Sequence, residues 1–138
     1  MSGRAATVGL VAAVALSGCG RSKPREVHAT LAEPKGCVVQ VFFASRMVTG
    51  RAATRDEIRA VRARIASSTK VRTYAFVSKE LALRRMARKL PDLTRGLHSN
   101  PLPDSFEVVP RSADDARSVV AELRLERGVE HVTASRAC

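Results

Sequence analysis

The sequence contains no tryptophan, one tyrosine and four phenylalanines, with three cysteines and three histidines among 138 residues. The histidines, His28, His98 and His131, stand apart without the spacing of metal ligands. A G-x-S-x-G segment, a phosphate-binding loop and a dinucleotide fingerprint are also missing. These absences argue against an enzyme, and the sequence predicts neither a metal nor a cofactor.

Acidic residues are the minority among the charged side chains. The chain has 24 Lys and Arg against 13 Asp and Glu, which gives a formal net charge of +11. The basic residues are scattered rather than grouped, a distribution typical of a solvated surface. Attraction to anionic lipid, wall polymer or nucleic acid is the alternative. The acidic pairs Asp56-Glu57 and Asp114-Asp115 fall in the first turns of expected helices, where the helix dipole accounts for them.

Apolar runs long enough to span a membrane are absent after residue 19. Before it, Arg4 precedes the apolar run 8–16, an arrangement typical of a signal peptide. Leu16-Ser17-Gly18-Cys19 resembles the lipobox of bacterial lipoproteins, which implies cleavage before Cys19 and acylation of that cysteine. The alternative is a secretory signal followed by an incidental cysteine. We expect a signal peptide over 1–18 and a lipid-anchored protein on the extracytoplasmic face of the cell membrane.

The segment 19–36 is polar and shows no sustained period, so we expect a lipidated cysteine followed by a flexible tether. The folded domain is expected over 37–138. Within it, β-branched and aromatic runs predict strands, and apolar residues at helical spacing predict helices. The expected strands span 38–44, 71–77, 105–109 and 129–135, and the expected helices span 54–68, 79–90 and a segment that begins at Ser112.

Local signals refine these elements. Thr54-x-x-Glu57 is a capping box for the first helix. Gly50 is the expected turn residue of a loop over 45–53, and Gly128 is expected to close the third helix in a left-handed conformation. In the third strand, Phe106 and Val108 should face the core, opposite Glu107. The second helix should bury the apolar residues Leu83, Met86, Ala87 and Leu90 and expose the basic residues Arg84, Arg85, Arg88 and Lys89.

The order of elements is strand, helix, strand, a helical insert of about 79–99, then strand, helix, strand. This order predicts an α+β, ferredoxin-like sandwich with a four-stranded, mainly antiparallel sheet and helices on one face. In the usual strand order 4-1-3-2, the start of the first strand lies beside the end of the last, where Cys37 and Cys138 stand. With Cys19 reserved for lipid, these two cysteines are an even pair in an exported protein and predict a disulfide. The alternative is an idle thiol at a frayed C-terminus.

The segment Asn100-Pro101-Leu102-Pro103 separates the two halves of the domain. Each proline fixes its own φ and moves the preceding residue away from helical geometry, so the chain should be extended here. We expect this motif, together with Phe106, to have a structural role: it leads out of the insert and into a central strand.

These residues resemble a known family. The resemblance rests on Val41-Phe42-Phe43, the helix near Thr54, the stretch from Val71 to Leu83 with its SKE-x-AL, NPLP-x-SF-x-V over 100–108, and Gly128-Val129-Glu130-x-Val132. Together they are similar to the extracellular domain of FtsX, a permease-like bacterial cell-division protein. The resemblance implies a regulatory binding domain, since FtsX pairs with the ATPase FtsE and its extracellular domain engages peptidoglycan hydrolases or their coiled-coil activators. Here a lipid anchor is expected in place of the permease body.

The insert is the expected partner-binding surface. Its candidate residues, which could hold a partner helix, are Met86, Leu90, Leu93 and Leu97. The alternative is that these side chains pack on one another and close the domain. Two other functions are alternatives: a structural envelope lipoprotein whose basic surface binds anionic wall polymer or lipid, and nucleic-acid binding. Export and the lack of an RNA-stacking aromatic strand argue against the second.

Overall fold

The computed structural model describes residue 20 and residues 22–138. The predicted signal peptide and the predicted lipidation site, Cys19, lie outside the described residues. In the described part of the chain, the strands are β1 (Arg25–Glu26), β2 (Val39–Phe43), β3 (Val71–Val77), β4 (Ser105–Pro110) and β5 (Val129–Ala134). The helices are α1 (Arg46–Thr49), α2 (Arg55–Ala66), α3 (Lys79–Lys89), α4 (Pro91–Thr94) and α5 (Ala113–Leu123).

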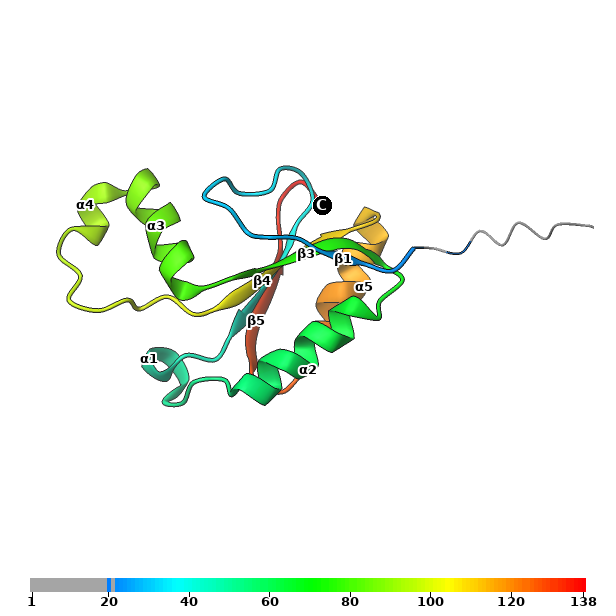
Figure 1. Cartoon of the computed structure of the whole chain (residues 1–138), viewed down its shortest axis with the longest axis horizontal. Helices are drawn as coiled ribbons and strands as arrows, with labels where there is room; N and C mark the ends of the chain where they lie inside the picture. The colour runs from blue at the N-terminus through cyan, green and yellow to red at the C-terminus, as the bar shows by residue number, and fades with distance from the viewer. Residues whose placement is uncertain (1–19, 21) are drawn as a thin grey trace, which may run out of the picture.

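One sheet joins the strands in the order β1-β3-β4-β2-β5. Neighbouring strands are antiparallel, except that β1 pairs with β3 in parallel. The strands β2 to β5 therefore have the predicted ferredoxin-like order, and the predicted four-stranded sheet is corrected to five strands by the addition of β1. Helices α2 and α5 cover one face of the sheet (Figure 1).

The hydrophobic core lies between this face and the two helices. The two-residue period of a strand directs alternate residues of β2 into the core, and these are Val39, Val41 and Phe43. Phe106 of β4 is fully buried among other aromatic rings. The rings of Phe43, Tyr74 and Phe76 meet it edge-on, at centroid distances of 5.7, 6.1 and 5.4 Å. Such edge-to-face contacts stabilise the centre of the sheet beyond simple burial.

The N-terminal strap, defined as residues 22–36, runs along the sheet instead of forming the flexible tether predicted for this region (Figure 1). In β1, Glu26 is opposite Tyr74, and the Val27 amide donates to the Tyr74 carbonyl at 2.9 Å. The Glu26 carboxylate accepts from the Tyr74 hydroxyl at 3.2 Å and lies 3.3 Å from Arg62 Nε. The physical reason is that β3 would otherwise be an edge strand with unpaired backbone groups, which an added strand can satisfy.

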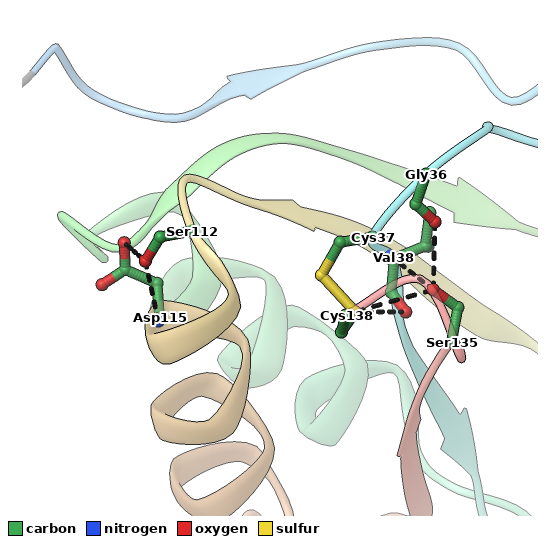
Figure 2. Close-up of a disulfide and its surroundings, with 7 residues drawn as sticks. All are labelled: Gly36, Cys37, Val38, Ser112, Asp115, Ser135 and Cys138. Carbon is green, nitrogen blue, oxygen red and sulfur yellow. Dashed lines mark hydrogen bonds between the residues drawn. A yellow bond between two sulfur atoms is a disulfide. The ribbon is translucent and has the colours of Figure 1, made fainter.

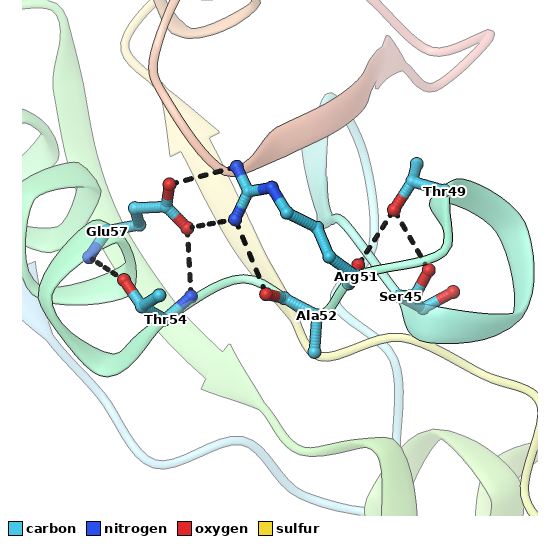
Figure 3. Close-up of polar contacts among 6 residues, drawn as sticks. All are labelled: Ser45, Thr49, Arg51, Ala52, Thr54 and Glu57. Carbon is cyan, nitrogen blue, oxygen red and sulfur yellow. Dashed lines mark hydrogen bonds and ion pairs between the residues drawn. The ribbon is translucent and has the colours of Figure 1, made fainter.

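Helix α2 begins at the predicted capping box (Figure 3). The Glu57 amide donates to Thr54 Oγ1 at 3.2 Å, and the Thr54 amide donates to the Glu57 carboxylate at 2.9 Å. Arg51 donates to both oxygens of the same carboxylate, each at 3.0 Å. The hydrogen bond from Arg51, followed by the one from the Thr54 backbone, lowers the pKa of Glu57 to about 2.

Glu57→Gln is expected to remove an acid-dependent part of the stability. The folded pKa of about 2 lies below the ordinary value of 4.5. The carboxylate therefore stabilises the fold fully above about pH 4.5, and this contribution is lost as the pH falls towards 2. Urea unfolding followed by circular dichroism should show a difference between wild type and variant that is constant from about pH 7 to 5 and shrinks below. Asp56→Asn, a control outside the capping box, should keep the wild-type pH dependence, and a pH-independent difference for Glu57→Gln would contradict the assignment.

Two glycines adopt the left-handed conformation near α2. Gly50, with φ of 78°, ends α1, which replaces part of the loop predicted over 45–53. Gly128, with φ of 82°, lies just before β5, whereas α5 already ends at Leu123. Gly128 has the predicted left-handed conformation, but it closes the turn into β5, whereas it was predicted to close the third helix. A Cβ atom at this position would lie 2.8 Å from Glu57 Cβ, so the close approach to α2 also requires glycine.

Cys37 and Cys138 form the predicted disulfide, with Cα atoms 4.5 Å apart (Figure 2). The two cysteines meet because β5 runs antiparallel beside β2. Ser135 supports the same corner: its hydroxyl accepts from the Val38 amide at 3.1 Å and donates to the Gly36 carbonyl at 3.0 Å. The bridge therefore joins the ends of two neighbouring strands.

Candidate interaction surface

The helical insert presents apolar side chains to solvent. It consists of α3, α4 and the loop that leads to β4, and it lies at one end of the long axis of the molecule (Figure 1). Leu90, Leu93 and Leu97 have exposed fractions of 50%, 65% and 42%. Met86 is half-buried and, with Leu90, lines a cavity of about 270 Å³ against the sheet. We call Leu90, Leu93 and Leu97 the insert surface; it contains three of the four residues that the sequence singled out.

Helix α3 does not bury the predicted stripe. Its fully buried residues are Leu81 and Arg85, whereas Leu83 and Met86 are half-buried and Leu90 lies just past its end. The predicted apolar stripe left Arg85 on the solvent face of the helix. A basic residue rarely occupies a core position without a partner. A partner is present here, and it comes from a part of the chain that helical periodicity does not reveal.

That partner is Glu107, which lies on the face of β4 opposite Phe106 and Val108. The prediction left this face outside the core, yet the side chains of Arg85 and Glu107 are 7% and 5% exposed. Arg85 Nη1 donates to Glu107 Oε1 at 2.5 Å, and Nη2 donates to Oε2 at 3.3 Å. This two-pronged geometry is the one in which a guanidinium recognises a carboxylate best.

Arg85 also holds the N-terminal strap. Its Nε donates to the Thr30 carbonyl at 2.8 Å, and its Nη2 donates to the Ala32 carbonyl at 3.3 Å. Four residues further along α3, Lys89 forms an ion pair with Glu33 of the strap. One buried side chain of α3 therefore connects the insert to both the central strand β4 and the strap. The position of α3 depends on these two contacts.

The segment 100–104 connects the other end of the insert to the sheet. Asn100 Nδ2 donates to the Lys79 carbonyl at 2.7 Å, and the Lys79 amide donates to the Asp104 carboxylate at 2.8 Å. The Asp104 carbonyl in turn accepts from the Phe43 amide at 3.0 Å. The motif that begins at Asn100 thus contacts the first residue of α3 and the last residue of β2.

A second exposed apolar area lies on α1 and was not predicted from the sequence. Met47 and Val48 are each 67% exposed. Between α1 and the segment 100–104 is a cavity of about 340 Å³. A helix of four residues is too short for periodicity to reveal. The adjacent apolar pair within a predicted loop was the available signal.

The histidines are not brought together. His28 lies in the strap, His98 follows α4, and His131 lies on β5 with its ring stacked at 6.3 Å from Phe42. Within residues 22–138, no group of three or more His, Cys, Asp and Glu side chains is placed to hold a metal ion. Over the same residues, each helix is too short or too polar to cross a bilayer.

The fold and its surface define a class: a small α+β domain of ferredoxin-like strand order, with a helical insert that exposes leucines. A family model described as the FtsX extracellular domain matches residues 37–138, and the chain belongs to this family. The resemblance seen in the sequence is therefore confirmed. Membership makes the chain an extracellular module of the bacterial cell-division system, situated outside the cytoplasm in association with the membrane.

Two solved structures are similar to this chain. The solution structure of the large extracellular loop of FtsX in Streptococcus pneumoniae is 15% identical, with a TM-score of 0.52, covering 71% of this chain and 98% of that one. The crystal structure of Extracellular Domain 1 of FtsX from S. pneumoniae, in complex with undecyl-maltoside, is 18% identical, with a TM-score of 0.54, covering 76% and 98%. At these identities the likeness establishes the fold. No curated protein matches the chain.

Proposed function

We propose that the chain is a membrane-anchored regulatory module that recognises a peptidoglycan hydrolase, or the coiled-coil activator of one, in cell division or cell-wall remodelling. The observation that carries the proposal is the insert surface, found in a member of the FtsX extracellular domain family. Its role is to bind and position a partner, so the proposal includes neither catalysis nor a cofactor.

The insert surface has the chemistry of a helix-binding site. Leu90, Leu93 and Leu97 follow one another at intervals of three and four residues and are 42% to 65% exposed. Burying such side chains in an interface is favourable by about 25 cal/mol per Å² of apolar surface. An amphipathic helix of a coiled coil offers apolar side chains at matching intervals. The undecyl-maltoside in the complex with Extracellular Domain 1 of FtsX, an amphiphile with an alkyl chain, supports an apolar binding capacity in this fold.

The lipid anchor is a separate part of the proposal. The sequence Leu16-Ser17-Gly18-Cys19 supports acylation of Cys19, and several acyl chains on one terminus would anchor the chain stably. Cys19→Ala is expected to abolish incorporation of a labelled fatty acid into the protein and to leave the signal peptide uncleaved. Metabolic labelling with immunoprecipitation, and the mass of the protein, measure these two changes. A variant that incorporates the label as wild type does would contradict lipid anchoring through Cys19.

Partner recognition is tested by making the insert surface polar. Leu93→Glu combined with Leu97→Glu is expected to weaken binding of the hydrolase or activator by at least about tenfold, because charge replaces the central apolar contacts. Binding can be measured by isothermal titration with candidate hydrolases and activators of the same cell.

Leu125 supplies the matched control for this experiment, since it is a leucine with an exposed fraction of 82% outside the insert. Leu125→Glu should leave the affinity unchanged. Equal effects of the two changes would contradict a specific role for the insert. Binding that survives both changes and disappears in about 1 M salt would favour the alternative function, a structural envelope lipoprotein with a basic surface for anionic wall polymer or lipid.

A further inference from the structure

The strap brings the N-terminal end of the described chain onto one particular end of the domain. Arg111, just past β4, donates from its guanidinium to the carbonyls of Ser22 and Thr69. β1 then fixes the next residues, with Arg25 opposite Thr73 of β3. Ser22 is three residues beyond Cys19, and an extended chain of that length reaches about 10 Å. An anchor at Cys19 would therefore hold this end of the domain near the lipid surface.

Basic side chains surround this attachment point. We call Lys23, Arg25, Arg72 and Arg111 the basic end. Arg72 directly precedes the residue that pairs with Arg25, and Arg111 contacts the residue before Lys23. Lys23, Arg25 and Arg72 are exposed, and none of the four residues forms an ion pair within residues 22–138.

Nearby carboxylates are already engaged. Glu26 contacts Arg62 and Tyr74, Asp114 pairs with Arg117, and Asp115 accepts from the Ser112 hydroxyl. Within residues 22–138, no carboxylate therefore pairs with the four charges of the basic end, and those of Lys23, Arg25 and Arg72 face solvent. This distinguishes them from the arginines of α2, of which Arg59, Arg62 and Arg64 each meet a carboxylate.

The insert lies at the opposite end of the molecule. In Figure 1 the chain enters beside β1 at one end of the long axis, and α3 and α4 lie at the other. A domain attached to a membrane by the first end would thus present Leu90, Leu93 and Leu97 away from the bilayer.

We propose that the basic end docks on anionic phospholipid head groups and holds the domain upright, with the insert surface directed away from the membrane. The proposal rests on the proposed anchor for its geometry and on the four unpaired charges for its chemistry. Each Lys or Arg beside an anionic surface contributes about fivefold in affinity. The short connection to the anchor keeps these charges at a high effective concentration near the lipid. Even weak contacts between these side chains and the head groups are therefore formed most of the time.

The test uses the full-length protein purified from membranes and reconstituted in vesicles of phosphatidylcholine, with or without phosphatidylglycerol. Fluorophores are attached at Thr69→Cys, beside the basic end, and separately at Ser99→Cys, in the insert. A head-group-labelled quencher lipid should quench the first label at least about threefold more than the second in vesicles that contain phosphatidylglycerol. In neutral vesicles, where the anchor acts alone, the difference between the labels should be clearly smaller. About 1 M NaCl should reduce the difference to its value in neutral vesicles.

Charge variants give the specificity control. Lys23→Gln with Arg25→Gln and Arg72→Gln should reduce the quenching difference between the two labels to its value in neutral vesicles. Arg84→Gln with Arg88→Gln and Arg124→Gln removes the same net charge from exposed positions elsewhere and should preserve it. Arg111 is left intact because it supports the strap. Equal loss in both triple variants, equal quenching of the two labels, or an equally large quenching difference in neutral vesicles would overturn the proposal.

Two further readouts separate the possible failures. Cosedimentation with neutral vesicles reports the anchor alone, whereas the added binding to phosphatidylglycerol vesicles reports docking, so loss of one leaves the other measurable. Soluble poly(glycerol phosphate) serves as a competitor. If it binds with the same dependence on Lys23, Arg25 and Arg72 while phosphatidylglycerol vesicles do not, the basic end is a wall-polymer site and the membrane-docking proposal is wrong.

Discussion

Arg85→Met is expected to lower the free energy of unfolding by about 3–5 kcal/mol, the largest loss that we predict for a single substitution. Methionine retains an unbranched side chain but leaves the Glu107 carboxylate buried without its partner. The carbonyls of Thr30 and Ala32 lose their donor at the same time. Urea unfolding at pH 7, followed by circular dichroism, measures the loss.

A double variant separates burial of an unpaired charge from simple loss of packing. Arg85→Met with Glu107→Leu removes both charges, and replacing both members of a buried pair is often close to neutral. We therefore expect it to recover most of the stability lost in Arg85→Met. A loss below about 1 kcal/mol in the single variant, or no recovery in the double variant, would contradict the role assigned to the pair.

Hydrogen exchange adds a local readout for the same residue. Because Arg85 holds the strap, exchange of the Val27 amide, which donates to Tyr74, should accelerate in Arg85→Met more than exchange in α5. Equal acceleration in both places would indicate global destabilisation without a specific connection to the strap.

Removing the disulfide by Cys37→Ser with Cys138→Ser is expected to cost up to about 4–5 kcal/mol on the chain-entropy estimate. The bridge spans 101 residues, so its loss releases nearly the whole domain from a constraint on the unfolded chain. Urea unfolding compares the variant with wild type, and reduced wild type should match the variant. A difference below about 1 kcal/mol would mean that the network around Ser135 holds this corner without the covalent bond.

The parts of the fold that the sequence predicted are those set by nearby residues. Thr54 and Glu57 are three positions apart, so the capping box that starts α2 could be recognised directly. The alternating apolar residues of β2 and β4 identified the core strands. The ferredoxin-like order then placed Cys37 beside Cys138 and, with Cys19 reserved for lipid, predicted their disulfide.

The errors have the opposite origin. Arg85 is buried because its carboxylate partner is on β4, 22 positions away, and the helix pattern contains no sign of it. The strap joins the sheet because β3 offers an unpaired edge, a property of the assembled sheet and not of the strap's polar sequence. Both of these errors therefore arose where a contact between distant segments outweighed a local preference.

The candidate site could be predicted only in part from the sequence. Helical spacing placed Leu90 in a buried stripe, but α3 ends at Lys89 and the chain turns at Pro91, which brings Leu90 to the surface with Leu93 and Leu97. The sequence could suggest that these leucines are exposed, because they follow the second helix on a segment that is apolar but not regular. The exposed pair Met47 and Val48 was missed, because a helix of four residues is too short for periodicity to reveal.

The central claim, that the insert surface contacts a partner in cell-wall hydrolysis, is tested most directly by photocrosslinking in growing cells. A photoreactive amino acid replaces Leu93 or Leu97, with Leu125 as the exposed control outside the insert. We predict that positions 93 and 97 capture a peptidoglycan hydrolase or its coiled-coil activator, identified by mass spectrometry, and that position 125 does not. Capture of no such protein from positions 93 and 97, or equal capture of it from position 125, would contradict the account.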